Sequence, residues 1–92
     1  MIRSFEHKGL EKFFTTGSKA GIQPRHAERL RRQLTVLDNA ICPEDMNLPG
    51  YGLHALKGKE AGTWSVSVNG NWRLTFRFEN ANAILVDYRD YH

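Results

Sequence analysis

Two runs of alternating apolar and polar residues flank the dipeptide Asn69-Gly70. The apolar positions are Trp64, Val66 and Val68 before it, and Trp72, Leu74, Phe76 and Phe78 after it. Alternation with a period of two predicts β-strands. Asn-Gly predicts a tight type I′ turn, because both central residues of that turn need a positive φ. This part of the chain is therefore expected to form a β-hairpin with one apolar face.

Two amphipathic helices are expected before the hairpin. Over residues 7–16, Leu10, Phe13 and Phe14 share one helical face, and Gly17 is a natural end for the helix. From Pro24 to about Ala40, leucines recur at helical spacing, with the proline where a first turn tolerates it.

The other segments complete the fold class. Residues 2–6 alternate and predict a short strand, residues 42–52 form a loop, and a turn at 80–82 leads into a last strand over 84–91. The chain is therefore predicted to be α+β, with two N-terminal helices packed on one face of a small, mostly antiparallel β-sheet. A chain of 92 residues predicts one domain, residues 1–92.

Composition excludes several classes of function. Cys42 is the single cysteine, which rules out an internal disulfide and a multi-thiolate metal site and fits a reducing cytoplasm. The four histidines show no ligand spacing, so no metal is expected. No phosphate-binding loop or dinucleotide fingerprint is present, so no cofactor is expected either. The sequence contains no membrane-length apolar run.

The positive charge has two interpretations. The net charge of +3 fits an anionic partner, but a small basic surface gives the same value. Arg25, Arg29 and Arg32 lie on one flank of the second predicted helix, either as a ridge for a nucleic-acid backbone or as a solvated face. Arg73 and Arg77 are expected on the sheet face opposite the helices, where they would form an uncovered cationic surface.

Proton-transfer groups gather in the last forty residues. RNA is cleaved when its 2′-hydroxyl attacks the adjacent phosphorus, which needs a base, an acid and cations at the phosphate oxygens. Histidine suits both proton roles because its pKa lies near neutral pH. The candidates for these roles are His54, Asp90, Tyr91 and His92 for proton transfer, and Lys57, Arg73 and Arg77 for the phosphate.

These residues also have structural interpretations. The end of the chain, Asp90-Tyr91-His92, fits a frayed terminus, and His54 fits a strand histidine bonded to the backbone. Strict alternation along the last strand would put Ile84, Val86, Tyr88, Asp90 and His92 on one face, and Tyr91 on the other. The three terminal groups then converge only if the strand ends or bulges near Arg89.

Six segments in order resemble the HigB toxins, a branch of the RelE/ParE superfamily of bacterial toxin–antitoxin systems. They are Met1–Phe5, His7–Leu10, Leu53–Gly58, Gly62–Val66, Asn71–Phe76 and Asp90–His92. The similarity runs from the first residue to the last and is weakest between Ser18 and Gly52.

The resemblance implies a compact RelE-like fold and a ribosome-dependent mRNA endonuclease that cuts the message in the decoding site. It implies a HigA-like antitoxin as partner, together with the ribosome and mRNA, and operator DNA bound only through the antitoxin. It implies that His54, Lys57, Arg73, Asp90, Tyr91 and His92 form the active site. Arg25, Arg29 and Arg32 would then meet ribosomal RNA.

One departure and two alternatives accompany this interpretation. Some relatives carry a basic residue where this chain has Asn69, and Arg77 and Arg89 are candidates to replace its phosphate contact. A ParE-like toxin on the same scaffold would inhibit DNA gyrase, although such a poison does not need two histidines in matched motifs. A non-catalytic member would act only as a binding and regulatory partner of its antitoxin.

Overall fold

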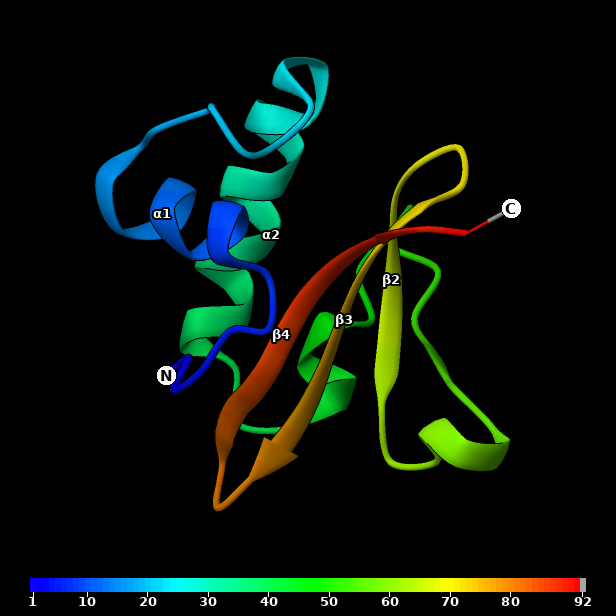
Figure 1. The fold of residues 1–92 in the computed structure, drawn as a ribbon. Helices are drawn as coiled ribbons and strands as arrows, with labels where there is room; N and C mark the ends of the chain where they lie inside the picture. The colour runs from blue at the N-terminus through cyan, green and yellow to red at the C-terminus, as the bar shows by residue number, and fades with distance from the viewer. Residues whose placement is uncertain (92) are drawn as a thin grey trace.

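The computed structural model describes residues 1–91, and His92, one of the predicted catalytic residues, lies outside the described residues. Within these residues, four strands form one antiparallel sheet in the order β1-β2-β3-β4, and two α-helices lie on one side of it (Figure 1). The elements in chain order are α1 (Lys8–Thr16), η1 (Pro24–His26), α2 (Ala27–Asn39), η2 (Pro43–Met46), β1 (His54–Ala55), η3 (Gly58–Glu60), β2 (Trp64–Asn69), β3 (Trp72–Glu79) and β4 (Asn82–Asp90), where η denotes a 3-10 helix. The predicted α+β class is confirmed.

Local sequence signals set the helix ends. The Nδ1 atom of His7 accepts a hydrogen bond from the backbone N–H of Leu10 at 2.9 Å and so caps the start of α1. Gly17 ends the helix with φ of 83°, a left-handed conformation that suits glycine. Pro24 opens η1, which continues into α2, so both predicted helices are confirmed.

One apolar layer fills the space between the helices and the sheet. It is built from both helices and the three long strands, and its fully buried members include Leu10, Leu30, Leu37, Val66, Leu74, Phe76 and Val86. The opposite side of the sheet carries mostly polar residues, with Ile84 as an apolar member opposite Arg77. No helix within residues 1–91 is long and apolar enough to cross a lipid bilayer.

The β2–β3 hairpin is confirmed, but its predicted turn is wrong by one residue. Asn69 pairs with Trp72, so the turn residues are Gly70 and Asn71, and only Gly70 has a positive φ, 57°. The cause is an irregularity in the pairing between Ser67 and Asn69, which shifts the register. The positive φ pair that a type I′ turn requires occurs in the next hairpin, at Asn80 (50°) and Ala81 (66°).

A bulge in β4 changes which side chains face the core. Leu85 has φ of 53°, and the β3–β4 register shifts between Thr75 and Arg77. Ala83 is buried before the bulge, and Val86 and Tyr88 are buried after it. The prediction that Ile84 shares their face is wrong, because the extra residue at Leu85 reverses the alternation.

Residues 2–6 pair beside β4 but form no continuous strand. Two isolated parallel bridges join Ile2 to Ala83 and Phe5 to Val86, one on each side of the bulge at Leu85. The predicted N-terminal strand is therefore replaced by two short contacts, because the bulge interrupts the ladder.

The backbone of α1 lies against the connector that precedes η1. A Cβ atom on Gly9 would lie 2.7 Å from the carbonyl oxygen of Gly21, and one on Gly21 would lie 2.5 Å from the Cα atom of Gly9. Both contacts are with backbone, which cannot rotate away. The two glycines therefore allow an approach that a larger residue would prevent.

We expect Gly9→Ala to lower the free energy of unfolding by about 1–3 kcal/mol, because the added methyl group overpacks this contact. Helix propensity alone predicts the opposite sign, a gain of about 1 kcal/mol. Urea denaturation measures the change, and Lys12→Ala, an exposed position in the same helix, should stay within about 0.5 kcal/mol of the unsubstituted protein. A more stable Gly9→Ala protein would contradict the close contact.

Candidate active site

We call the side of the sheet away from the helices the open face. Residues that pair directly across antiparallel strands share a face, so the register identifies its members. They are His54, Ser65, Ser67, Arg73, Thr75, Arg77, Ile84, Asp87 and Arg89. Four strands therefore contribute to a single surface.

Ser65 lies between two of the predicted catalytic residues. Its hydroxyl is buried and accepts a hydrogen bond of 3.0 Å from an Nη atom of Arg73, which is half-buried. On the other side of Ser65, His54 is its direct partner across β1 and β2, with an exposed side chain. The Nδ1 atom of His54 lies 3.4 Å from the carbonyl oxygen of Gly52. The structure therefore brings His54 and Arg73 to one face.

Lys57 follows β1 and stands at the start of η3 with an exposed side chain. The strand before it ends at Ala55, and the backbone N–H of Leu56 still bonds to Thr63 at 2.8 Å. Lys57 thus begins a short loop whose two ends are joined by this backbone hydrogen bond between Leu56 and Thr63.

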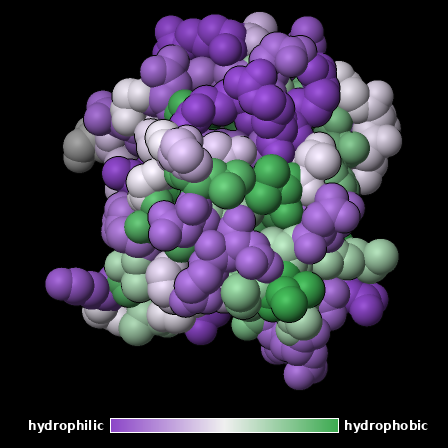
Figure 2. Space-filling model, turned by 180° about the vertical axis from the view of Figure 1, so that it is seen from behind, coloured by the Kyte–Doolittle hydropathy of each residue, from purple (hydrophilic) through white to green (hydrophobic). Residues whose placement is uncertain are grey.

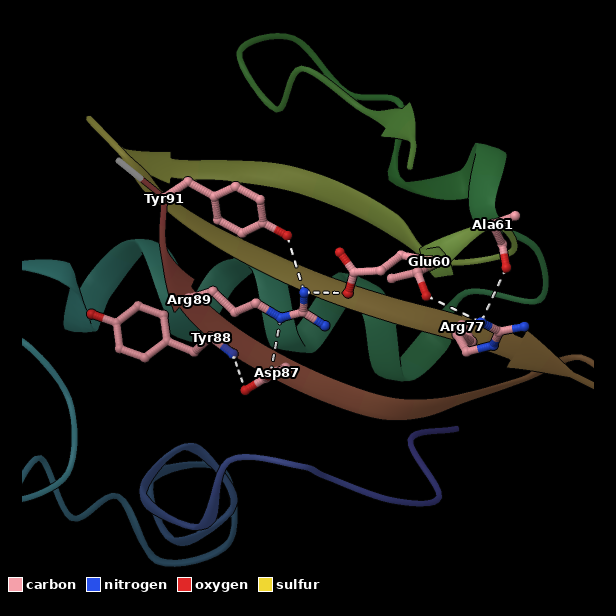
Figure 3. A network of polar contacts seen from close by, with 8 residues as sticks. Glu60, Ala61, Arg77, Asp87, Tyr88, Arg89 and Tyr91 are labelled. Carbon is pink, nitrogen blue, oxygen red and sulfur yellow. Dashed lines mark hydrogen bonds and ion pairs between the residues drawn. The ribbon is translucent and has the colours of Figure 1, made fainter. Parts of the chain in front are cut away.

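Tyr91 and Asp90 lie on different sides of the sheet. The backbone N–H of Tyr91 donates to Asn71 at 2.8 Å, and its hydroxyl accepts from Arg89 at 3.1 Å, on the open face (Figure 3). Asp90 pairs with Trp72, on the side of the helices. The predicted separation of Asp90 from Tyr91 is confirmed for these two residues.

Asp90 borders a pocket of about 380 Å³ at the end of the hairpin. Its other lining residues are Arg25, Asn69, Gly70, Asn71 and Trp72. Hydrophilic residues gather at the end of the molecule where α2 begins and the hairpin turns, whereas apolar residues cross the middle of the same face (Figures 1 and 2). The pocket is thus polar, and Arg25 places a cation on its wall.

The open face is not the uncovered cationic surface that the sequence predicted. Arg77 donates to the carbonyl oxygen of Ala61 and to the hydroxyl of Thr63, both at 3.2 Å. Arg89 pairs with the carboxylates of Glu60 and Asp87. Acidic residues from η3 and β4 therefore balance part of the charge, and the pairing with Glu60, 29 residues away in the sequence, cannot be deduced from strand alternation.

Arg25 in η1 and Arg29 and Arg32 in α2 differ in their surroundings. Arg25 and Arg32 are exposed. Arg29 is half-buried, and its Nη2 atom donates to the carbonyl oxygens of Gly50 at 2.7 Å and Ser67 at 3.1 Å. Its guanidinium also lies 5.5 Å from the ring centre of Tyr51. Arg29 therefore ties α2 to β2 and to the loop before β1.

Metal ligands do not gather in the part of the chain that the structure describes. Among residues 1–91, no group of three or more histidine, cysteine, aspartate or glutamate side chains is arranged to hold a metal ion.

A buried histidine behind the pocket was not singled out from the sequence. His26 is 1% exposed, and its Nδ1 atom lies 2.6 Å from the hydroxyl of Tyr88. The ring of Tyr88 stacks on Trp72 with centres 4.5 Å apart. Its position in the sequence could have indicated burial, because His26 stands four residues before Leu30 and so lies on the apolar face of the predicted helix. This cluster joins η1 to the ends of β3 and β4.

The cluster is expected to make folding sensitive to acid. Burial lowers the pKa of the His26 imidazole, and the charge of Arg25 lowers it further. Burial likewise raises the pKa of the Tyr88 phenol, so both groups are neutral at neutral pH.

We expect stability to fall as the pH drops below 6.5, the ordinary pKa of histidine, because the unfolded chain then binds a proton that folded His26 resists. The loss should continue down to the lowered pKa of the folded state. Chemical denaturation at several pH values measures it, and the decrease should be smaller in His26→Gln. His54→Gln, at an exposed position, should keep the slope of the unsubstituted protein; equal slopes in all three would exclude this role of His26.

Comparison with known proteins identifies the family. The family model of the HigB-like toxins, RelE-like toxins of the type II toxin–antitoxin system HigB, matches residues 3–92. The chain is 41% identical over 92 residues to Endoribonuclease HigB of Proteus vulgaris, with both chains covered completely. It is 33% identical over 94 residues to Toxin HigB-1 of Vibrio cholerae serotype O1, covering all of this chain and 98% of that relative. The chain therefore belongs to the HigB-like family of type II toxins.

Proposed function

We propose that the protein is a ribosome-dependent endoribonuclease that cuts mRNA in the decoding site and so arrests translation. The observation that carries the proposal is the shared face of His54 and Arg73, which lie on either side of the buried Ser65 hydroxyl. A relative that matches the full chain is named an endoribonuclease, which supports the same class of reaction.

The proposed reaction needs no covalent intermediate. A base takes the proton of the 2′-hydroxyl while its oxygen attacks phosphorus, and an acid gives a proton to the departing 5′-oxygen. His54 supplies one of these proton-transfer groups on the open face. Tyr91, Asp90 and His92 are the candidates for the other, and of the first two only Tyr91 shares the face of His54.

Arg73 and Lys57 are the proposed phosphate ligands. The bond to Ser65 holds the guanidinium of Arg73 in one orientation, so little reorganisation is needed when charge builds on the phosphate oxygens. Lys57 is exposed at the start of its loop and can reach an oxygen as a point charge. Arg77 is also a proposed RNA ligand, although its two present contacts fix it farther along β3.

Partners follow from the family and from the exposed cations. A type II toxin has an antitoxin as its partner, and we propose that this one is HigA-like and carries the binding to operator DNA. Arg25 and Arg32 are exposed and are proposed to meet ribosomal RNA, whereas Arg29 would do so only through the part of its guanidinium that Gly50 and Ser67 leave accessible. Because the proposed reaction takes place on ribosomes, we propose that the protein acts in the cytoplasm.

We expect purified protein to cut a defined message on programmed ribosomes, with new ends inside the decoding-site codon and none without ribosomes. His54→Ala and His92→Ala should each slow cleavage by about 10²–10⁴-fold, because each removes a proton-transfer group. Mapping the message ends by primer extension measures both effects. Full activity in either variant would remove that histidine from the mechanism.

The same assay tests the alternatives. Intact message together with growth arrest and loss of DNA supercoiling would favour a gyrase poison. Intact message without growth arrest would leave a protein that acts only by binding its antitoxin.

We expect Arg73→Ala to cost about 3–4 kcal/mol of transition-state stabilisation, or roughly 10²–10³-fold in rate at saturating ribosomes, by analogy with the loss of an oxyanion donor. Single-turnover cleavage measures the rate. Arg3→Ala removes an exposed arginine at the N-terminus and is the matched control, with an unchanged rate. A loss below about fivefold in Arg73→Ala would show that Arg73 helps to position the message and does not stabilise the transition state.

A further inference from the structure

One guanidinium on the open face is bonded to three different side chains. Arg89 is the direct cross-strand partner of Arg73. Its Nε atom donates to Asp87 at 2.9 Å, and one Nη atom bonds to both the carboxylate of Glu60 and the hydroxyl of Tyr91, the latter at 3.1 Å. Figure 3 shows these groups converging on Arg89 from the strand, the η3 loop and the end of the chain.

These contacts connect the segments that carry two of the proposed site residues. Glu60 is the last residue of η3, the short helix that follows Lys57, and its backbone N–H donates to the carbonyl oxygen of Lys57 at 3.4 Å. Tyr91 follows directly after β4. Arg89, the cross-strand partner of Arg73, therefore links the Lys57 loop to the Tyr91 hydroxyl.

The same contacts leave Arg89 poorly suited to hold a phosphate. Burial alone lowers the pKa of its guanidinium, but the hydrogen bonds that it donates to Glu60 and Asp87 raise the pKa above the ordinary value, so the group stays charged. Two carboxylates surround that single positive charge, and an incoming phosphate would have to displace them. The replacement of a missing hairpin cation by Arg89 is therefore disfavoured.

We propose that Arg89 is a positioning residue that holds the Tyr91 hydroxyl and the Lys57 loop in place relative to Arg73. This inference rests on the proposed function, since it names how that site is assembled. The fork of the guanidinium matters because a lysine has the charge but cannot reach three partners from one planar group.

The first test separates chemistry from binding. In Arg89→Gln and Arg89→Lys, the maximal rate of message cleavage should fall about 10–100-fold, because small displacements of reacting groups cost this much. The ribosome concentration at half-maximal rate should change less than about threefold. Arg31→Gln breaks another arginine–glutamate pair, with Glu28 on α2, and should retain both values. Full activity in Arg89→Lys would show that charge alone suffices and would overturn the proposal.

A triple variant in which all three groups are uncharged makes the test sharper. Arg89→Gln combined with Glu60→Gln and Asp87→Asn removes the uncompensated carboxylates that Arg89→Gln leaves behind. Positioning predicts that this triple variant stays as impaired as Arg89→Gln. Recovery to the rate of the unsubstituted protein would show that Arg89 only neutralises its neighbours, which contradicts positioning.

A second readout does not depend on cleavage. The three tyrosines can be labelled with 3-fluorotyrosine, and the Tyr91 signal is assigned with Tyr91→Phe. In Arg89→Lys the ¹⁹F signal of Tyr91 should shift while that of Tyr51 stays, and the unfolding midpoint should move by less than about 5 °C because Arg89 and Glu60 are partly exposed. An unchanged Tyr91 signal would overturn the proposal. Failure of the unsubstituted protein to cut message would instead overturn the proposed function and leave this contact established by its ¹⁹F shift.

Discussion

The pairing of β3 with β4, and the extra residue at Leu85 within it, determines the rest of the arrangement. A shift of one residue in a strand exchanges the two faces of everything that follows. Without the bulge, alternation from the buried Ala83 would turn Asp87 and Arg89 toward the core. With it, Val86 and Tyr88 complete the apolar layer, and the charged residues reach the side where Arg73 lies. The backbone conformation of Leu85 therefore decides which side chains of β4 face the core and which face the candidate site.

Much of the fold could be predicted from the sequence because its signals are local. Gly17 and Pro24 bound the helices, and the alternation around residues 69–70 predicts the hairpin. The errors arise where local preference competes with pairing between distant segments. The positive φ values of Asn80 and Ala81 lie in a turn without glycine, and the bulge at Leu85 has no marker in the sequence.

The candidate site was predicted less completely, because several of its contacts join residues that are far apart in the sequence. Motifs selected His54, Arg73 and Tyr91, which share the open face. The pairing of Arg89 with Glu60, 29 residues earlier in the chain, depends on how η3 folds back over the sheet. The contact between His26 and Tyr88 joins residues 62 positions apart. Such pairs become visible only in three dimensions.

The N-terminal contacts with β4 limit how another chain can bind this protein. Exposed strand edges commonly accept an additional strand from a partner, through backbone hydrogen bonds. Here residues 1–6 occupy the outer edge of β4 at Ala83 and Val86, and the Asp87 carboxylate takes the backbone N–H of Tyr88 farther along. At the other edge, β1 is only two residues long. Strand addition at β4 would require displacing the N-terminus, and β1 offers only two residues for pairing, so we expect a partner that leaves this fold intact to recognise it through its side chains.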